Sequence, residues 1–93
     1  MVTKVNASHI LVKTEDEAKV ILGELQQGKS FEALAMEKSL CPSKKKGGSL
    51  GWFTRGRMVR EFEIAAFSLR KGQISPPVKT QFGWHIIKVV DTE

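Results

Sequence analysis

A chain of 93 residues is long enough for one domain with a single hydrophobic core, and we place that domain at residues 1–93 with its core at about 5–91. The apolar share of 41% is ordinary for a folded protein, which argues against disorder. The formal charge of +5 could attract nucleic acid or acidic partners, but charge alone bears on solubility and encounter rates and identifies neither.

Targeting and redox signals predict an intracellular setting. No apolar run approaches the ~20 residues of a membrane span, and no signal-peptide pattern precedes residues 2–12. The single cysteine, Cys41, cannot form an internal disulfide. We therefore expect a cytoplasmic monomer that is not bound to a membrane.

The first strand is predicted at residues 5–12, VNASHILV, which are rich in β-forming residues and bounded by polar ones. Alternation along a strand places His9 on the face shared by Ala7 and Leu11, with Ile10 on the opposite face. Apolar side chains on both faces are typical of a central strand that is covered on both sides.

Two helices are predicted after this strand. Thr14 and Glu17 match a capping box at the start of the first, and Gly28 is suited to its left-handed stop. Ser30 can cap the second helix, which should end near Ser39 because Pro42 disfavours helix in the residue preceding it. The apolar stripes of the two helices are Ala18, Ile21, Leu22 and Leu25 in the first and Phe31, Leu34 and Ala35 in the second.

The middle of the chain combines a loop, a short strand and a third helix. Residues 41–48 are a loop by composition, residues 50–54 read as a strand, and residues 55–57 form a glycine turn. The apolar face of the helix that follows comprises Met58, Val59, Phe62, Ala66 and Leu69. Met58 and Phe62 would be neighbours near its start, a thioether and a ring suited to holding a small apolar ring. Helical spacing alone favours an ordinary core role for both.

The last third of the chain supplies two more strands. Residues 75–77 are forced into an extended form by two prolines and lead into a short edge strand at 78–80. A second strong strand follows at 84–90, WHIIKVV, where His85 shares a face with Ile87. The order of elements indicates an α+β protein with a small, antiparallel sheet.

His9, His85 and Cys41 are the residues whose chemistry could form a site, although a lone histidine in a strand is most often a hydrogen-bonded core residue. Three alternatives are open. A zinc site would use such ligands, but no close ligand pair of the C-x-x-C kind is present. A Cys-His nucleophile pair would need an oxyanion hole, and no protease-like signature surrounds Cys41. The third alternative is a hydrogen-bonded floor beneath an apolar pocket, and the residues alone do not choose among the three.

A basic run at Lys44–Lys46 is most often a solvated loop. A phosphate-binding glycine loop would place its lysine after the glycines, and here the order is reversed. Nucleic-acid binding would require exposed stacking aromatics, and Trp52 and Phe53 lie close by but fit a strand equally well. A basic module that binds RNA or nascent chains is therefore the runner-up, with nucleic acid as a secondary partner.

Three segments together are highly specific: ASHILVK at 7–13, GGSLGWFTRGRMVREFEIAAF at 47–67 and PPVKTQFGWHIIKV at 76–89. They resemble the parvulin-type peptidyl-prolyl cis/trans isomerases, and the resemblance covers nearly the whole chain in the right order and spacing. The similarity is greatest to small stand-alone prokaryotic parvulins that consist of the catalytic domain alone.

This resemblance implies a four-stranded antiparallel sheet wrapped by three to four helices, and an isomerase that rotates Xaa-Pro bonds in polypeptides without a cofactor or metal. It also implies roles by position. His9 and His85 match paired histidines at the centre of the sheet. Thr80 matches a hydroxyl that joins their network, and Cys41 a position filled by Cys or Asp. The matched positions of the proline pocket are Leu50, Met58 and Phe62, with Phe82 as an aromatic lip.

One departure bears on substrate choice. Phosphate-directed parvulins carry basic residues after the first strand, whereas Thr14–Glu17 is acidic here and would repel a phosphate. We therefore expect no phosphoserine preference, a neutral or apolar residue before proline, and a role in protein folding. We also expect a non-covalent mechanism in which at least one buried histidine stays neutral at pH 7. A holdase-type chaperone that uses the same groove is a further alternative.

Overall fold

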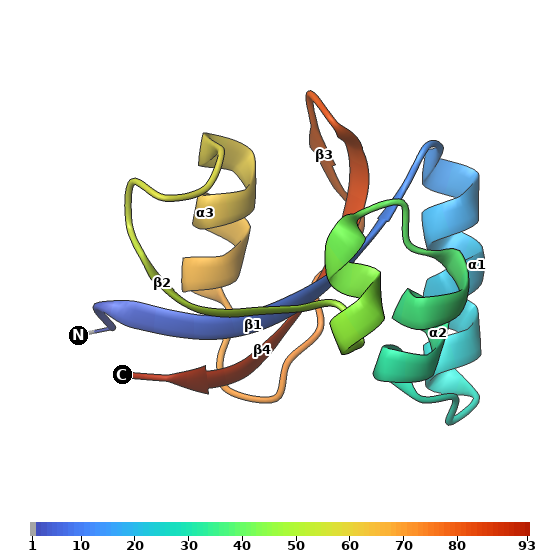
Figure 1. Cartoon of the computed structure of the whole chain (residues 1–93), viewed down its shortest axis with the longest axis horizontal. Coiled ribbons are helices and arrows are strands. Elements are labelled where there is room, and N and C mark those ends of the chain that lie inside the picture. The colour runs from blue at the N-terminus through green and yellow to red at the C-terminus, as the bar shows by residue number, and fades with distance from the viewer. Residues whose placement is uncertain (1) are drawn as a thin grey trace.

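The computed structural model describes residues 2–93, which form one mixed sheet-and-helix assembly (Figure 1). The elements in chain order are β1 (Lys4–Val12), α1 (Glu15–Gln26), α2 (Phe31–Lys38), the 3-10 helix η1 (Pro42–Lys46), β2 (Ser49–Thr54), α3 (Arg60–Ser68), β3 (Val78–Thr80) and β4 (Gly83–Thr92). The strands lie in the order β2-β1-β4-β3, and every neighbouring pair is antiparallel. The predicted α+β class and four-stranded antiparallel sheet are confirmed.

β1 and β4 are the two inner strands; β1 is buried along most of its length, and β4 is buried at His85, Ile86, Ile87 and Val89. Their register pairs His9 with Ile87 and Leu11 with His85. Because side chains alternate along a strand, the two histidines point to the same face of the sheet as diagonal neighbours. The prediction of a central first strand covered on both faces is therefore correct.

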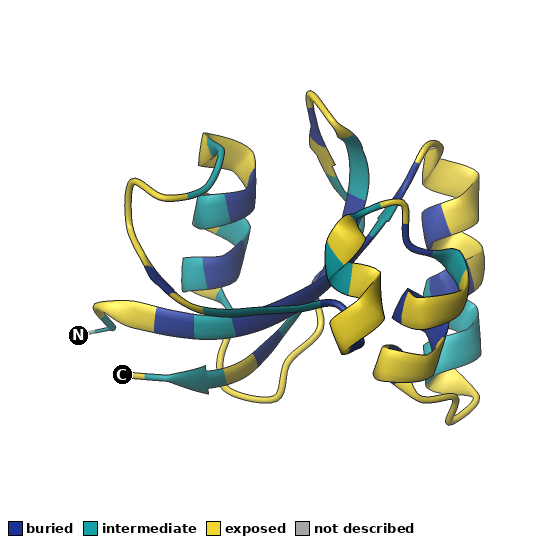
Figure 2. Cartoon of the chain, viewed as in Figure 1, coloured by how far each residue is buried: buried dark blue, intermediate teal, exposed yellow. Residues whose placement is uncertain are grey.

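Hydrophobic clusters lie on both faces of this sheet, and Figure 2 shows the buried positions following the inner strands. The buried residues of the first cluster, on the α1 and α2 side, are Ile10, Val12, Ala18, Ile21, Phe31, Leu34, Ala35 and Ile86. Those of the second, on the α3 side, are Val5, Ala7, Phe53, Phe62, Ala66, Ile87 and Val89. Because side chains alternate in direction along β1 and β4, successive residues point to opposite faces and pack into different clusters. The sheet therefore separates two cores.

The starts of α1 and α2 follow the predicted capping chemistry. Thr14 Oγ1 accepts a hydrogen bond from the backbone N–H of Glu17 at 3.2 Å, and Ser30 Oγ accepts one from Ala33 at 3.2 Å. Gly28 follows the end of α1 with a φ of +97°, which is the left-handed stop expected there. Among residues 2–93, no helix combines the length and apolar character that a membrane crossing requires.

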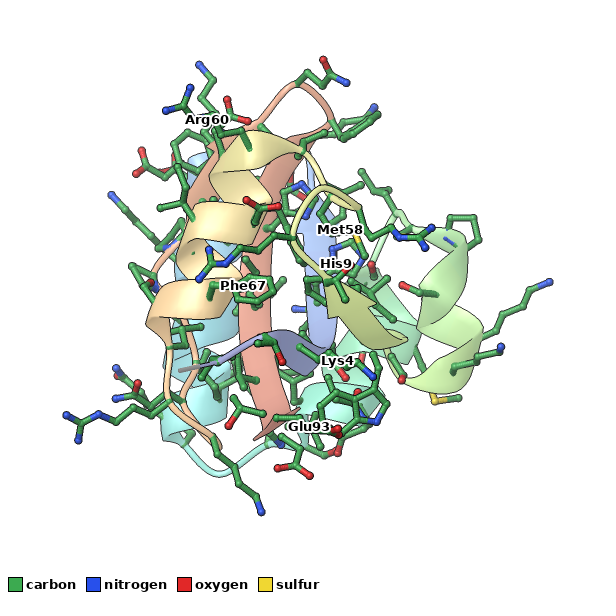
Figure 3. All side chains as sticks on the ribbon, turned by 90° about the vertical axis from the view of Figure 1, so that its left-hand side faces the viewer. Lys4, His9, Met58, Arg60, Phe67 and Glu93 are labelled. Atoms are coloured by element: carbon green, nitrogen blue, oxygen red, sulfur yellow. The ribbon has the colours of Figure 1, made fainter. Side chains whose placement is uncertain are left out.

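The third helix begins later than predicted. α3 starts at Arg60 and Val59 is its N-cap, so Met58 precedes the helix and is not part of it. The apolar spacing is the same whether or not Met58 is helical, and Gly56 in the preceding turn has a φ of +88°, which is not helical. Figure 3 shows Met58 beside His9, and both residues line one cavity. The region predicted as a plain loop at 41–48 also contains the short helix η1.

Gly48 brings the start of β2 against β1. The N–H of His9 donates to the carbonyl oxygen of Gly48 at 2.9 Å, and Gly48 has a φ of +87°. A Cβ at this position would collide with the backbone of His9 and crowd Ala35. Only glycine allows this close approach, which fixes one end of the strand that carries Leu50.

Candidate active site

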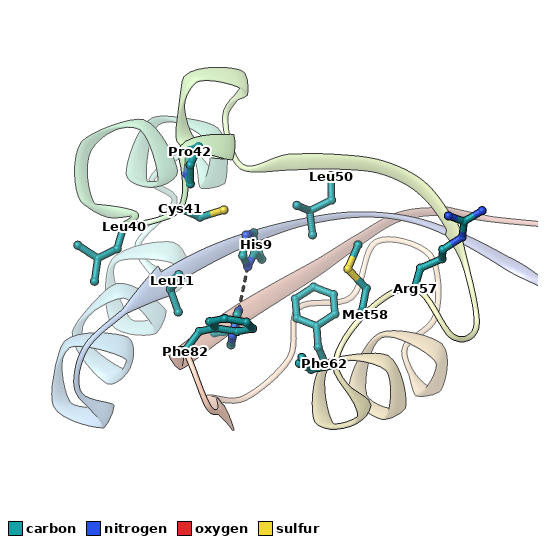
Figure 4. A pocket seen from close by; sticks show the side chains of 12 residues that line it. His9, Leu11, Leu40, Cys41, Pro42, Leu50, Arg57, Met58, Phe62 and Phe82 are labelled. Atoms are coloured by element: carbon teal, nitrogen blue, oxygen red, sulfur yellow. Dashed lines mark hydrogen bonds between the residues drawn. The ribbon is translucent and has the colours of Figure 1, made fainter.

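The two histidines meet at the centre of the sheet. Nδ1 of His9 and Nδ1 of His85 are 2.9 Å apart, the hydrogen bond drawn as a dashed line in Figure 4. The ring planes are inclined by 18°, and the ring centroids are 5.1 Å apart. Both side chains are buried, with 5% and 4% of their residue surface exposed. The register of β1 and β4 thus joins two residues that are 76 positions apart in sequence.

Thr80 extends this pair into a chain of hydrogen bonds. Its Oγ1 lies 2.7 Å from Nε2 of His85, and the backbone N–H of Phe82 donates to the same oxygen at 3.1 Å. Thr80 ends the edge strand β3 and is itself buried. The tight turn between β3 and β4 therefore places the hydroxyl behind the histidine pair, as the resemblance implied.

Two directions of donation along this chain fit the hydrogen bonds of Thr80. A hydroxyl oxygen has two acceptor lone pairs, so Thr80 Oγ1 can accept from the N–H of Phe82 and still either donate to or accept from Nε2 of His85. In one arrangement Nδ1–H of His85 donates to Nδ1 of His9, and the ring proton of His9 is on Nε2; in the other, Nδ1–H of His9 donates to Nδ1 of His85, and Nε2 of His9 carries a lone pair. That nitrogen is buried and has no hydrogen-bond partner among residues 2–93.

Both histidines are uncharged at neutral pH. Burial lowers the pKa of His9 to about 4, and the neighbouring His85 adds to this effect. Burial also lowers the pKa of His85 to about 4. We expected at least one histidine to stay neutral, and both do, because two close imidazoles in an apolar environment both resist protonation.

An apolar cavity of about 470 Å³ opens beside the histidine pair (Figure 4). The ring of Phe62 stands edge-on to both imidazoles, at centroid distances of 5.5 Å to His9 and 5.3 Å to His85. The lining residues are His9, Leu11, Leu40, Cys41, Pro42, Leu50, Arg57, Met58, Val59, Phe62, Phe82 and His85. The structure thus brings seven of the eight predicted site residues to one cavity, and Thr80 is bonded behind it.

Cys41 and Phe82 occupy the periphery of this cavity. Cys41 is half-buried, and no hydrogen bond joins its Sγ to either histidine within residues 2–93. Phe82 is 59% exposed, which suits a rim position. The described residues contain no group of three or more His, Cys, Asp or Glu side chains that could hold a metal ion. The geometry is that of the third alternative, a hydrogen-bonded floor beneath an apolar pocket.

Five lining residues did not emerge from the sequence: Leu11, Leu40, Pro42, Arg57 and Val59. The position of Leu11 in the cavity could have been predicted, because alternation along the strand places its side chain on the same face as His9. Leu40 is 55% exposed and lies in an irregular segment, where no periodicity reports orientation. Arg57 is next to Met58 in a turn and was read only as a turn residue.

The segment that carries Arg57 and Met58 is fastened to α3. The carboxylate of Glu63 accepts a hydrogen bond from the backbone N–H of Gly56. The guanidinium of Arg55 lies over the ring of Phe67, 4.3 Å from its centroid. These two contacts hold the turn between β2 and α3 at the mouth of the cavity.

A four-stranded antiparallel sheet with a histidine pair beneath an apolar cavity defines a parvulin-type isomerase. The family model described as "PPIC-type PPIASE domain", also called rotamase, matches residues 3–91. The chain therefore belongs to this family of peptidyl-prolyl isomerases, in agreement with the resemblance found in the sequence.

Relatives and solved structures agree with this family. The chain is 60% identical to foldase protein PrsA 1 of Bacillus cereus, over 95% of this chain and 31% of that protein. It matches the solution structure of NmPin, a parvulin of Nitrosopumilus maritimus, with a TM-score of 0.88, 47% identity, and coverage of 98% and 99% of the two chains. A crystal structure of PrsA from Bacillus anthracis gives a TM-score of 0.96 at 49% identity, with coverage of 99% and 43%. The chain spans about a third of the length of the curated relatives it matches.

Proposed function

We propose that this isomerase domain acts on unphosphorylated Xaa-Pro bonds of polypeptides, favours a neutral or apolar Xaa, and assists protein folding. The observation that carries the proposal is the apolar cavity that opens beside two uncharged histidines. The similarity to proteins named foldases supports the role in folding.

Rotation about the prolyl bond requires no covalent chemistry. The barrier of ~18–20 kcal/mol arises from amide resonance, which is lost when the peptide is twisted. An enzyme accelerates the rotation if it binds the twisted form better than either planar form. Leu50, Met58 and Phe62 provide apolar walls for the pyrrolidine ring, so the ring is held while the preceding carbonyl turns. The same walls exclude water, which would otherwise stabilise the charge-separated planar amide.

The histidine pair gives this cavity an uncharged polar floor. Neutral imidazoles impose no desolvated charge on the substrate, and their hydrogen bonds lock β1 to β4 beneath Phe62. His9 and His85 thereby position the cavity wall, and Thr80 fixes the orientation of His85. Cys41 lines the cavity without a base bonded to its sulfur, which favours a non-covalent route over thiolate attack.

The charge at the start of α1 supports discrimination against phosphate. Glu15, Asp16 and Glu17 form its first turn, which begins four residues after Leu11 of the cavity lining. A phosphoserine carries about −1.5 to −2 charges at pH 7 and would be repelled there. A neutral residue before proline avoids this repulsion.

A basic binding module for RNA is not favoured, because the cavity and the family both fit an isomerase. A holdase activity that uses the same apolar groove is compatible with the foldase relatives. The cytoplasmic location and the monomeric state stay predictions from the sequence. Cell fractionation tests the first, and light scattering coupled to size-exclusion chromatography tests the second.

The direct test is cis/trans exchange measured by NMR on Ala-Xaa-Pro-Phe peptides with Xaa as Leu, Ala, Glu or phosphoserine. We expect faster exchange than in the free peptide, greatest for Leu and least for phosphoserine. Met58→Ala and Phe62→Ala should each lower kcat/KM roughly tenfold or more, because the pocket loses apolar contact with the ring. Met36→Ala is the matched control, since Met36 is 59% exposed and outside the cavity. Absence of acceleration on every peptide would overturn the proposal.

A further inference from the structure

A second depression adjoins the proline cavity along β2. Its volume is about 450 Å³, and its lining residues are Lys4, Leu50, Trp52, Phe53, Thr54, Arg57 and Met58. Leu50, Arg57 and Met58 also line the first cavity, so these three side chains form a wall shared by the two spaces. One polypeptide segment can therefore reach both.

The second depression is positively charged. Lys4 and Arg57 are exposed, and neither side chain forms an ion pair or hydrogen bond with any residue of the described range 2–93. The carboxylate of Glu63, which belongs to the neighbouring helix, is already engaged by the backbone of Gly56. Glu93 lies at the same end of the sheet as Lys4 (Figure 3), where its carbonyl oxygen accepts from the backbone N–H of Lys4 at 3.1 Å. Two cations thus face the depression without an anionic side-chain partner.

An apolar surface accompanies these cations. Trp52 is 44% exposed, which is unusual for so large an aromatic side chain. It lies on β2, an edge strand that pairs with β1 alone. An aromatic ring that lines the same depression as two cations offers a platform for the methylene groups of a side chain whose carboxylate reaches the cations.

We propose that this second depression, lined by Lys4, Trp52 and Arg57, is a subsite for an aspartate or glutamate side chain of the same polypeptide whose proline occupies the first cavity. The inference rests on the isomerase function proposed above. In this proposal, selectivity for an acidic side chain applies to a substrate position other than the residue directly before proline. At the residue before proline, the acidic first turn of α1 disfavours negative charge.

Negative side chains lie towards one end of the cavity and positive side chains towards the other. Figure 4 shows Leu11 and Leu40 at one end of the lining and Arg57 at the other. The acidic first turn of α1 follows Leu11 in sequence, whereas Lys4 and Arg57 belong to the second depression. A substrate with a carboxylate on the β2 side would be attracted, and one with its charge on the α1 side repelled. Electrostatic complementarity of this kind selects orientation more than it adds affinity.

The test uses peptides with a central Ala-Leu-Pro-Phe in a neutral host, in which one other position at a time carries Glu or Gln. We expect kcat/KM for the Glu peptide to exceed that for the Gln peptide by roughly three- to tenfold at one or two adjacent positions at low salt. The ratio should approach one in about 0.5 M NaCl, because exposed charges are screened. Acceleration of the Gln peptides reports the isomerase function by itself, so failure of the subsite and failure of the function are distinguishable.

Charge-neutral variants locate the effect. Lys4→Gln and Arg57→Gln should each lower the Glu-to-Gln ratio at least about twofold, and the pair together should bring it close to one. Lys19→Gln, an exposed lysine of α1 with the same change in net charge, should leave the ratio unchanged. The indole N–H resonance of Trp52 should shift more with the Glu peptide than with the Gln peptide, whereas that of Trp84 should not discriminate. Equal kcat/KM for Glu and Gln at every position, or an equal loss of preference in the Lys19 variant, would overturn the subsite.

Discussion

At the scale of single residues, the hydrogen-bond network at the centre of the protein depends on the protonation states of two histidines. His9 and His85 share one hydrogen bond between their Nδ1 atoms, and Thr80 Oγ1 is hydrogen-bonded to Nε2 of His85 from behind. Protonation of both rings would set two Nδ1–H donors against each other and break the hydrogen bond between the histidines. Both pKa values are lowered to about 4, so the neutral form extends well below physiological pH.

This shift predicts a stability that depends on pH. Because each folded-state pKa is below the ordinary 6.5, the unfolded chain binds more protons between pH 6.5 and 4. Stability is therefore fully present above about pH 6.5 and falls as the pH is lowered towards 4. A single shift of this size corresponds to about 3 kcal/mol, and we expect a loss of this order in the free energy of unfolding.

Urea unfolding measured at intervals from pH 7.5 to 4, together with ring nitrogen shifts of the two histidines, tests this prediction. Hydrogen bonds from Lys29 and Lys38 lower the pKa of Glu24 below its ordinary 4.5. The stability from that carboxylate is consequently lost only below about pH 4.5, outside most of the histidine window. Titration of either imidazole near pH 6.5 in the folded protein would contradict the prediction.

Cys41 provides the second prediction at this scale. Its sulfur is bonded to neither histidine among the described residues, and the proposed route needs no nucleophile. We expect Cys41→Ser to retain at least about a tenth of the kcat/KM measured by NMR exchange, because serine keeps the shape of the lining. Loss of a true nucleophile costs several orders of magnitude. A loss of about a thousandfold in a folded Cys41→Ser protein would favour covalent catalysis.

At the scale of elements, the turn between β2 and α3 determines the mouth of the cavity. It carries Arg57 and Met58, and α3 holds it through Glu63 and Phe67. Because Met58 lies outside the helix, its position depends on these contacts and not on helical geometry. Two specific interactions thus hold this turn against α3.

Removing one of these interactions should affect substrate binding. Glu63→Ala leaves the N–H of Gly56 without its acceptor, and we expect kcat/KM to fall about three- to tenfold as Met58 loses its fixed position. Glu63→Gln keeps a carbonyl acceptor at the same place and should restore most of the activity. Glu61→Ala is the control, because Glu61 is exposed in the same helix turn and its side chain forms no hydrogen bond or ion pair with any of residues 2–93. Equal activity in all three variants would show that the turn does not need this contact.

At the scale of the whole molecule, the sheet divides the interior into a core for stability and a core that also supports the cavity. The cluster under α1 and α2 contributes no residue to the cavity, whereas Phe62 belongs both to the α3 cluster and to the lining. Ile87 is fully buried in that second cluster and pairs with His9 in register. Equal changes in packing on the two faces should consequently have unequal effects on activity.

Matched substitutions test this division. Ile21→Val and Ile87→Val each remove one methylene group from a buried isoleucine, and each should lower the free energy of unfolding by about 1 kcal/mol. Ile87→Val should also lower kcat/KM several-fold, because a void in the cluster that contains Phe62 loosens the cavity wall. Ile21→Val should leave kcat/KM close to that of the unchanged protein. Urea unfolding and NMR exchange on the same preparations give both quantities, and equal losses of activity would contradict the division.

Much of the fold was predictable because its signals are local. The caps at Thr14 and Ser30, the stop at Gly28 and the alternation along β1 each depend on a few neighbouring residues, and the structure confirms them. The start of α3 was predicted too early because apolar spacing does not distinguish a helix from the turn that leads into it. The eight site positions were predicted from similarity to the motifs of the family. The spacing of apolar residues did not identify them by itself.

The sequence by itself determined the α+β class, the face on which each histidine lies and the family. Only the tertiary structure decided that His9 and His85 share a hydrogen bond and that both pKa values fall, because register and burial depend on pairing between strands far apart in the chain. It also decided that Lys4 and Arg57, which are 53 positions apart, line one depression beside the cavity. Periodicity reports the direction in which a side chain points, whereas the distance between two such side chains is set by packing of the complete fold.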